Sequence, residues 1–172
     1  DKVMFRYGFQ TLKGVLKEEC KSMIEMSIDK GLVNALGSLP AADYDPFLHL
    51  EYLMGLSTRS GLPLHVHVDQ NNTASEIETE MLAKATMRHG LEGRVVAVHG
   101  ISIACHPKKY RQEVYKMCKD AGIIFVTCPT AWIDSRRTEL LSPTHNAITP
   151  VDEMLNYDIP VALGTDNIHD IY

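Results

Sequence analysis

Short apolar segments alternate with longer segments of helical periodicity along the whole chain. Six of the apolar segments are rich in Val, Ile and Leu, as strands buried on both faces of a parallel sheet are. The pattern predicts strands at residues 3–9, 32–36, 62–68, 94–99, 123–128 and 160–164. With about 30 residues per strand–helix unit, this order indicates parallel strands joined by right-handed crossovers.

The segments between the strands carry apolar residues at helical spacing, and several have recognisable ends. We predict helices at residues 15–30, 45–60, 75–89, 107–121 and 149–156. Asp45 followed by Pro46 is typical of an N-cap with proline at the first helical position. Ser75-Glu-Ile-Glu78 has the spacing of a capping box, and Glu76, Glu78 and Glu80 are expected to form a solvated helix start.

Two α/β architectures fit this order, an open doubly wound sheet and a (β/α) barrel. A doubly wound nucleotide-binding fold usually has a Gly-rich turn after a strand, and the chain contains no such motif. Several strands end in polar or titratable residues, which is where barrels place their active sites. A complete barrel has eight units over ~250 residues. We therefore expect an α/β chain of 172 residues that forms a partial (β/α)8 TIM-type barrel without the first strands, as one incomplete domain over 1–172.

An incomplete barrel has a consequence for association. Six strands cannot close a ring built for eight, so the first and last strands are expected to present unpaired backbone edges. Such edges are usually covered by another chain. The sequence therefore predicts a homo-oligomer, or association through exposed barrel edges.

Composition restricts the remaining partners to small molecules. The formal net charge is −5 and no basic cluster exceeds two residues, so nucleic acid is not expected as a partner. No apolar run approaches the ~20 residues of a membrane span. The four cysteines form no C-x-x-C pair, which favours reduced thiols and a cytoplasmic location over a disulfide framework or a thiolate zinc site.

Titratable residues gather at the ends of three predicted strands. Alternation along residues 62–68 places His65, His67 and Asp69 on one face, while His99 and Asp166 end later strands. Imidazole nitrogens with a carboxylate are the usual ligands of catalytic zinc or non-haem iron. The alternative is a set of buried histidines bonded to backbone carbonyls, with Asp166 as a helix N-cap. We expect His65, one step deeper than His67, to be buried, hydrogen-bonded and without metal contact.

These residues resemble the amidohydrolase superfamily, and within it the cytosine deaminase-like branch. His67-Val-Asp-Gln70 resembles the motif on strand five of that barrel, His99 its strand-six histidine, and Gly164-Thr-Asp166 its strand-eight aspartate. Three motifs in order at barrel spacing are more specific than any one alone. The likeness covers essentially the whole chain, from strand three to strand eight.

The resemblance implies a site with one divalent metal ion, zinc or iron. It implies His67 and Asp166 as metal ligands, with Asp166 also accepting a proton and His99 polarising the substrate. It also suggests substrate contacts for Gln10 and for Asn167. His67, His99 and Asp166 are then expected to converge on one rim, with their side chains within about 6–8 Å of a common point, since first-shell bonds are ~2 Å long.

Two departures from the family pattern bear on activity. The H-x-H pair of the family's first strand has no equivalent before residue 49, so this chain alone is expected to bind metal weakly and to be inactive. Gln70 stands where deaminases of the family have a glutamate, and an amide cannot shuttle a proton. Gln70 remains a substrate-binding candidate, and Asp69 or Asp166 must then move the proton. No lysine occurs within residues 32–40, where two-metal members carry a bridging lysine, which favours a single ion.

One candidate lies in the long irregular segment 129–148. Trp132 has a flat ring on which a cyclic substrate can stack, or it anchors the segment as a lid. The sequence thus predicts a metal-dependent hydrolase acting on a non-peptide C–N bond, as a deaminase or amidohydrolase, of a small cyclic or N-heterocyclic substrate. Two alternatives stay open: a catalytically inactive barrel fragment that only binds a small molecule or a partner chain, and an unrelated α/β binding module.

Overall fold

The computed structural model describes residue 4, residues 6–129 and residues 148–166. These residues form one parallel sheet whose strands follow one another in chain order, from the edge strand β1 to the edge strand β6. The strands are β1 (Gly8–Gln10), β2 (Ala35–Ser38), β3 (Leu64–Val68), β4 (Val95–His99), β5 (Ile124–Thr127) and β6 (Val161–Leu163).

In the part of the chain that the structure describes, a helix follows each strand from β1 to β5. The α-helices are α1 (Glu18–Asp29), α2 (Pro46–Ser60), α3 (Glu78–Arg88), α4 (Lys108–Asp120) and α5 (Val151–Asn156), with short 3-10 helices η1 (Pro40–Ala42) and η2 (Ser102–Cys105) after β2 and β4. Within the described residues, no helix is long and apolar enough to cross a membrane.

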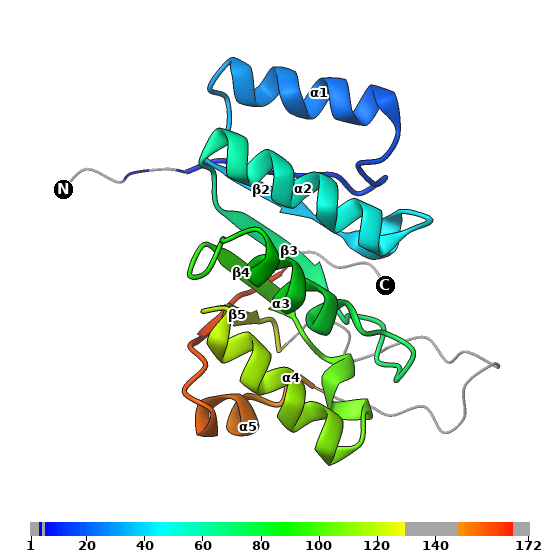
Figure 1. The fold of residues 1–172 in the computed structure, drawn as a ribbon, viewed down its shortest axis with the longest axis vertical. Coiled ribbons are helices and arrows are strands. Elements are labelled where there is room, and N and C mark those ends of the chain that lie inside the picture. The colour runs from blue at the N-terminus through cyan, green and yellow to red at the C-terminus, as the bar shows by residue number, and fades with distance from the viewer. Residues whose placement is uncertain (1–3, 5, 130–147, 167–172) are drawn as a thin grey trace.

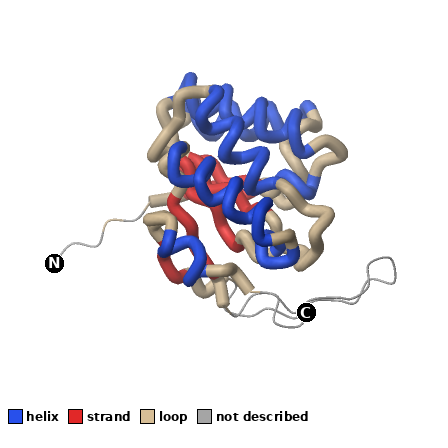
Figure 2. The backbone as a smooth tube through the Cα atoms, turned by 60° about the horizontal axis from the view of Figure 1, so that its bottom comes forward, coloured by secondary structure: helices blue, strands red, loops and turns tan. Residues whose placement is uncertain are grey.

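The order of the strands decides between the two architectures. A doubly wound sheet reverses its strand order at a switch point and covers both faces with helices. Here the order never reverses, and helices α1 to α4 lie side by side in front of the strands (Figure 1). The strands form one layer beneath the helices when the molecule is turned (Figure 2). Successive right-handed crossovers produce this one-sided arrangement, so the predicted barrel-type α/β fold is confirmed.

Alternation along the strands gives the sheet two different faces. Leu36, Leu64 and Val66 point into the main apolar core between sheet and helices, where they are fully buried. Gly37, His65 and His67 occupy the opposite face, because neighbouring strands pair Gly37 with His65 and residues in register share a face. A cavity of about 450 Å³ opens on this second face. The site residues therefore project away from the helical layer.

Two buried residues fix the loop that follows β1. The Asp43 carboxylate accepts the backbone N–H groups of Val15 (2.7 Å) and Leu16 (3.4 Å) and lies 2.6 Å from His49 Nδ1. His49 is fully buried, and this burial lowers its pKa, so the neutral ring donates to Asp43. Gly14 has a φ of 84° and lies so close to Asp43 that a Cβ there would overlap the carboxylate. The loop after Gln10 is thus held by one carboxylate.

Some predicted boundaries were wrong. The first strand was predicted at 3–9 and lies at Gly8–Gln10, so Gln10 is in the strand and not after it. The capping box at Ser75 is absent: α3 begins at Glu78, its N-cap is Ile77, and no side chain of the cap residue bonds the helix. The N-cap at Asp45 is confirmed, since its carboxylate accepts the N–H groups of Phe47 and Leu48.

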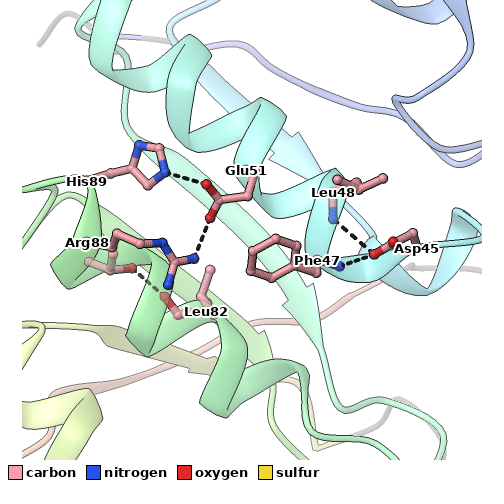
Figure 3. A network of polar contacts seen from close by, with 8 residues as sticks. Asp45, Phe47, Leu48, Glu51, Leu82, Arg88 and His89 are labelled. Carbon is pink, nitrogen blue, oxygen red and sulfur yellow. Dashed lines mark hydrogen bonds and ion pairs between the residues drawn. The ribbon is translucent and has the colours of Figure 1, made fainter.

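Polar contacts join the outer surfaces of α2 and α3 (Figure 3). Glu51 on α2 lies between Arg88 and His89 at the end of α3, bonded to both. The Arg88 guanidinium also lies 5.5 Å from the centre of the Phe47 ring. Bonds to Arg88 and His89 lower the pKa of Glu51 against the opposing effect of burial. These contacts fix the two helices that cover β2 and β3.

The open edges lead to a prediction about association. β1 is a three-residue edge strand beside an apolar cavity of about 310 Å³ whose lining includes Leu12 and Met23. Leu163 in β6, the other edge, is 81% exposed. We expect the isolated 172-residue chain to be oligomeric or aggregation-prone, because among the described residues β1 and β6 each have a strand neighbour on one side only, next to apolar side chains. Light scattering measures this directly. A monodisperse monomer with a cooperative thermal transition would contradict the prediction.

Candidate active site

Two histidines meet at the carboxyl end of the sheet. His67, in β3, and His99, the last residue of β4, have ring nitrogens 3.0 Å apart, from His67 Nδ1 to His99 Nε2. The ring centroids are 4.9 Å apart and the planes are tilted by 60°. One nitrogen donates the proton and the other accepts it. The remaining nitrogen of His99, Nδ1, is buried and has no hydrogen-bond partner among the described residues.

The backbone of His99 explains how the rings meet. His99 pairs in register with Val68, which points into the core, so simple alternation would send His99 there too. His99 instead has a φ of 75°, in the left-handed region that non-glycine residues rarely adopt. The hydroxyl of Thr149 donates to the His99 carbonyl oxygen. The left-handed turn redirects the imidazole to the rim, and strained residues of this kind cluster at functional sites.

Burial keeps both rings neutral. It lowers the pKa of His99 to about 4. Burial is also the main cause of the lowering of the His67 pKa to about 4, to which His99 adds, while the carboxylate of Asp166 acts in the opposite direction. Near pH 7 each ring therefore retains an unprotonated nitrogen, which is the form that binds a metal ion.

We predict that the His67 and His99 rings titrate near pH 4, well below the ordinary value near 6.5. An unfolded chain takes up protons as pH falls through 6.5, whereas the folded rings do so only near 4. The free energy of unfolding therefore keeps the full contribution of these rings above pH 6.5 and loses it as the pH falls from 6.5 to about 4.

The measurement is an NMR titration of the two rings in metal-free protein. The free energy of unfolding is a less direct measure, because the pH dependence that Glu78 contributes has the opposite sign to that of the histidines. Burial raises the pKa of Glu78 to about 7, so its contribution is present below 4.5 and lost as pH rises through about 7. Midpoints near 6.5 for both rings would contradict the buried, neutral pair.

Other predicted residues lie around the histidines. Asp166 is half-buried and has a φ of 55°. It lies close enough to His67 for its charge to oppose, in part, the lowering of the His67 pKa by burial. Gln10 lines the 450 Å³ cavity together with His65 and His67. Gln70 is half-buried, two residues beyond the end of β3. Trp132 and Asn167 lie outside the described residues.

The expectation for His65 was wrong in two respects, burial and hydrogen bonding. His65 is exposed at the open face of the sheet, where it has no hydrogen-bond partner among the described residues. Burial was expected because His65 lies one step deeper than His67 on the same face, but the open sheet leaves this face uncovered enough to expose the ring.

Asp69 also departs from the simple alternation. β3 ends at Val68, and Asp69 has a φ of 51° that turns its side chain toward the start of α3. Its carboxylate accepts the N–H groups of Glu78 (2.7 Å) and Thr79 (3.3 Å), while Glu78 accepts the Asp69 N–H (3.1 Å). Burial raises the pKa of both carboxyls. Asp69 therefore caps a helix and does not face His67.

The expectation of a solvated helix start was wrong as well. Glu76 and Glu78 are each only 8% exposed. Asp69, Glu76 and Glu78 each have a carboxylate oxygen within 4.8 Å of the others, a spacing that can hold a cation. Backbone N–H groups and hydroxyls already occupy these oxygens, which accounts for the cluster without an ion. The available sequence signal was the donor-rich run Asn71-Asn-Thr73 just before the acidic residues.

A family model for the amidohydrolase family matches residues 20–172. This chain belongs to the amidohydrolase family. An uncharacterized protein of Haemophilus influenzae is 42% identical over 157 residues, which cover 89% of this chain and 56% of that protein. The N-isopropylammelide isopropyl amidohydrolase of Pseudomonas sp. (strain ADP) is 26% identical over 156 residues, covering 90% of this chain and 35% of that enzyme. All four cysteines of this amidohydrolase are free, as expected.

Solved structures of other proteins share the fold of this chain. The 5-methylcytosine deaminase of Klebsiella pneumoniae, liganded with phosphonocytosine, superposes with a TM-score of 0.85 at 23% identity. The match covers 95% of this chain and 40% of that enzyme. The chain therefore spans little more than half the length of the Haemophilus relative, and less of the other two proteins.

The residues at the rim suit a divalent ion in chemical type. Imidazole nitrogens and a carboxylate are the donor types that zinc and non-haem iron take. Asp166 lies close enough to His67 to act on it electrostatically, but the ligand atoms of His67, His99 and Asp166 do not all lie within 4.8 Å of one another. Within the described part of the chain, the rim therefore offers the right donor types without forming a complete metal site.

Proposed function

We propose that the protein carrying this chain is a metal-dependent hydrolase that cleaves a non-peptide C–N bond of a small cyclic or N-heterocyclic compound. The neutral His67–His99 pair carries the proposal, because it places two imidazoles 3.0 Å apart at the carboxyl rim of a barrel-type sheet. Family membership supports the reaction class. The Pseudomonas relative, whose name describes an amidohydrolase of N-isopropylammelide, supports the substrate class.

In this proposal His67 and Asp166 hold one divalent ion, zinc or iron, which lowers the pKa of water toward neutrality when bound. Asp166 accepts the proton of the attacking water and later releases it to the leaving nitrogen, since Gln70 cannot. His99 donates a hydrogen bond to the charge that develops on the substrate. Gln10, in β1, and Gln70, after the end of β3, hydrogen-bond the substrate ring. Trp132 and Asn167 make further contacts with the substrate.

The contacts of Asp69 support Asp166 as the proton carrier. Asp69 was one of two candidates, and its carboxylate is buried against α3 with its oxygens bonded to the N–H groups of Glu78 and Thr79. We therefore propose Asp166 as the carboxylate that moves the proton.

The test is release of ammonia or amine from a panel of aminopyrimidines and amino-triazines by the natural protein that contains these residues, loaded with zinc or iron. His99→Asn is expected to lower kcat by about 10²–10³, with a smaller change in KM, because the lost bond strengthens in the transition state. His89→Asn is the matched control, since His89 lies on the outer surface and bonds Glu51. Equal activity of His99→Asn and wild type would reject the assignment.

A binding-only role is the second candidate, and Gln70 favours it because the usual proton-moving glutamate is replaced. Calorimetry together with the amine assay distinguishes the two roles. Under the binding-only role, the metal-loaded protein binds a cyclic compound in the calorimeter and Gln10→Ala weakens that binding, but no amine is released at any pH. We further propose that the partners of the protein are small cyclic molecules, and that copies of the chain associate through the sheet edges.

A further inference from the structure

The loop that leaves β3 and the loop that leaves β4 are joined by a set of hydrogen bonds, one of them buried and the others part-buried. Glu76 Oε2 accepts the backbone N–H of Asn71 (2.7 Å) and the hydroxyl of Ser102 (2.5 Å). Glu76 Oε1 accepts the side-chain amide of Asn71. The Ser102 oxygen in turn accepts the N–H of Thr73 (3.1 Å). We name Glu76, Asn71 and Ser102 the strand-end clamp.

Backbone bonds place the strand-end clamp directly beside the histidines. Gly100 N–H donates to the Val68 carbonyl (3.1 Å), and Ser102 N–H donates to the Asp69 carbonyl (2.9 Å). Ser102 lies three residues after His99, and Asn71 lies four residues after His67. The clamp therefore ties the chain that follows one imidazole to the chain that follows the other.

The clamp also fixes Gln70 on both sides. The residue before it, Asp69, is held by α3, and the residue after it, Asn71, is held by Glu76. His106 Nε2 donates to the Glu76 carbonyl (2.7 Å), so the backbone of Glu76 is anchored as well. A rigid support of this kind is what keeps functional groups within a fraction of an ångström of their working positions.

We propose that Glu76, acting through Ser102 and Asn71, is a positioning residue that sets the contact between the His67 and His99 imidazoles and the presentation of Gln70. This inference rests on the proposed function for its consequence, because the imidazoles and Gln70 are the groups of the proposed site. Glu76 itself touches neither imidazole in this structure. Its carboxylate instead holds Asn71 and Ser102, which lie in the loops that follow the two strands.

The proposal is tested by NMR on the natural protein that contains these residues, in metal-free form. Long-range ¹⁵N–¹H spectra and ring-to-ring NOEs report the His67–His99 contact, and amide exchange reports the Asn71 N–H. Glu76→Gln keeps the side-chain size but replaces one acceptor oxygen by a donor. Ser102→Ala removes a single oxygen. Glu80→Gln is the matched control, since Glu80 lies one turn along and bonds Lys84 and Tyr110 outside the clamp.

Glu76→Gln and Ser102→Ala are expected to weaken the ring-to-ring NOE and to shift the imidazole ¹⁵N signals, while Glu80→Gln leaves both unchanged. The Asn71 amide should exchange about ten-fold faster in Glu76→Gln, because a charge-assisted bond is lost. If Glu76→Gln does not fold, Ser102→Ala decides by the same spectra.

A lower melting temperature with unchanged imidazole spectra in the folded variants would overturn the proposal, because Glu76 would then only stabilise the loop. The experiment needs neither metal nor turnover. Failure of the natural protein to release amine would contradict the proposed function and would leave the result on the clamp unaffected.

Discussion

His67→Ala is expected to lower the affinity of the chain for zinc by about 100-fold or more. Loss of second-shell partners alone costs 10–100-fold in metal sites, and His67 is proposed to bind the ion directly. The wild-type chain should itself bind weakly and lose its metal on dialysis, since the site offers two imidazoles and one carboxylate among the described residues. Competition with a chromophoric chelator measures both affinities.

The matched control is His65→Ala, two residues earlier on the same face of β3. His65 is exposed and is expected to make no metal contact, so its removal should change the zinc affinity by no more than about two-fold, a free-energy change below that of a typical hydrogen bond. Stoichiometric zinc retained by His67→Ala after dialysis would show that the proposed ligand set is wrong.

Asp43→Ala is expected to lower the free energy of unfolding by about 3–5 kcal/mol, because each buried donor that loses its acceptor costs about 1–3 kcal/mol. The Asp43 side chain is 5% exposed and accepts hydrogen bonds from Val15, Leu16 and the fully buried neutral ring of His49. Alanine leaves all three donors without this acceptor. Urea denaturation followed by circular dichroism measures the loss.

Asp45→Ala provides the comparison, because Asp45 is two residues away and also accepts two backbone N–H groups. Asp45 is an exposed N-cap, whose removal typically costs ~1 kcal/mol. If Asp43→Ala cost no more than Asp45→Ala, the carboxylate would not hold the loop after Gln10 in the way the structure indicates.

Sequence pattern predicted the order of elements and the two histidines, for identifiable reasons. Strands β3 to β5 are short runs rich in Val and Ile whose core-facing residues are buried beneath the helices, and this pattern depends on local spacing. His67 was found because a polar residue alternates with buried valines. Asp45 was found because Asp-Pro specifies an N-cap with little dependence on tertiary structure.

The rest depended on backbone turns that the pattern does not encode. Alternation placed Asp69 beside His67, and a left-handed residue turned it toward α3 instead. Acidic residues at a helix start are usually solvated, and Glu76 is buried only because Ser102, 26 residues later, comes to meet it. His65 was expected to be buried because it lies one step deeper than His67 on the same face, yet its side chain is exposed.

The three left-handed strand-end residues have a consequence for redesign of this chain. Asp69, His99 and Asp166 have φ values of 51°, 75° and 55°, a conformation that costs an ordinary L-residue roughly 1–2 kcal/mol and glycine almost nothing. Judged by backbone preference alone, all three positions call for glycine, as Gly100 next to His99 already shows with its φ of 64°. A stability-guided redesign would therefore be drawn to His99 and Asp166, on which the proposed chemistry depends, and to Asp69, which caps α3. These three strained positions are residues to leave unchanged.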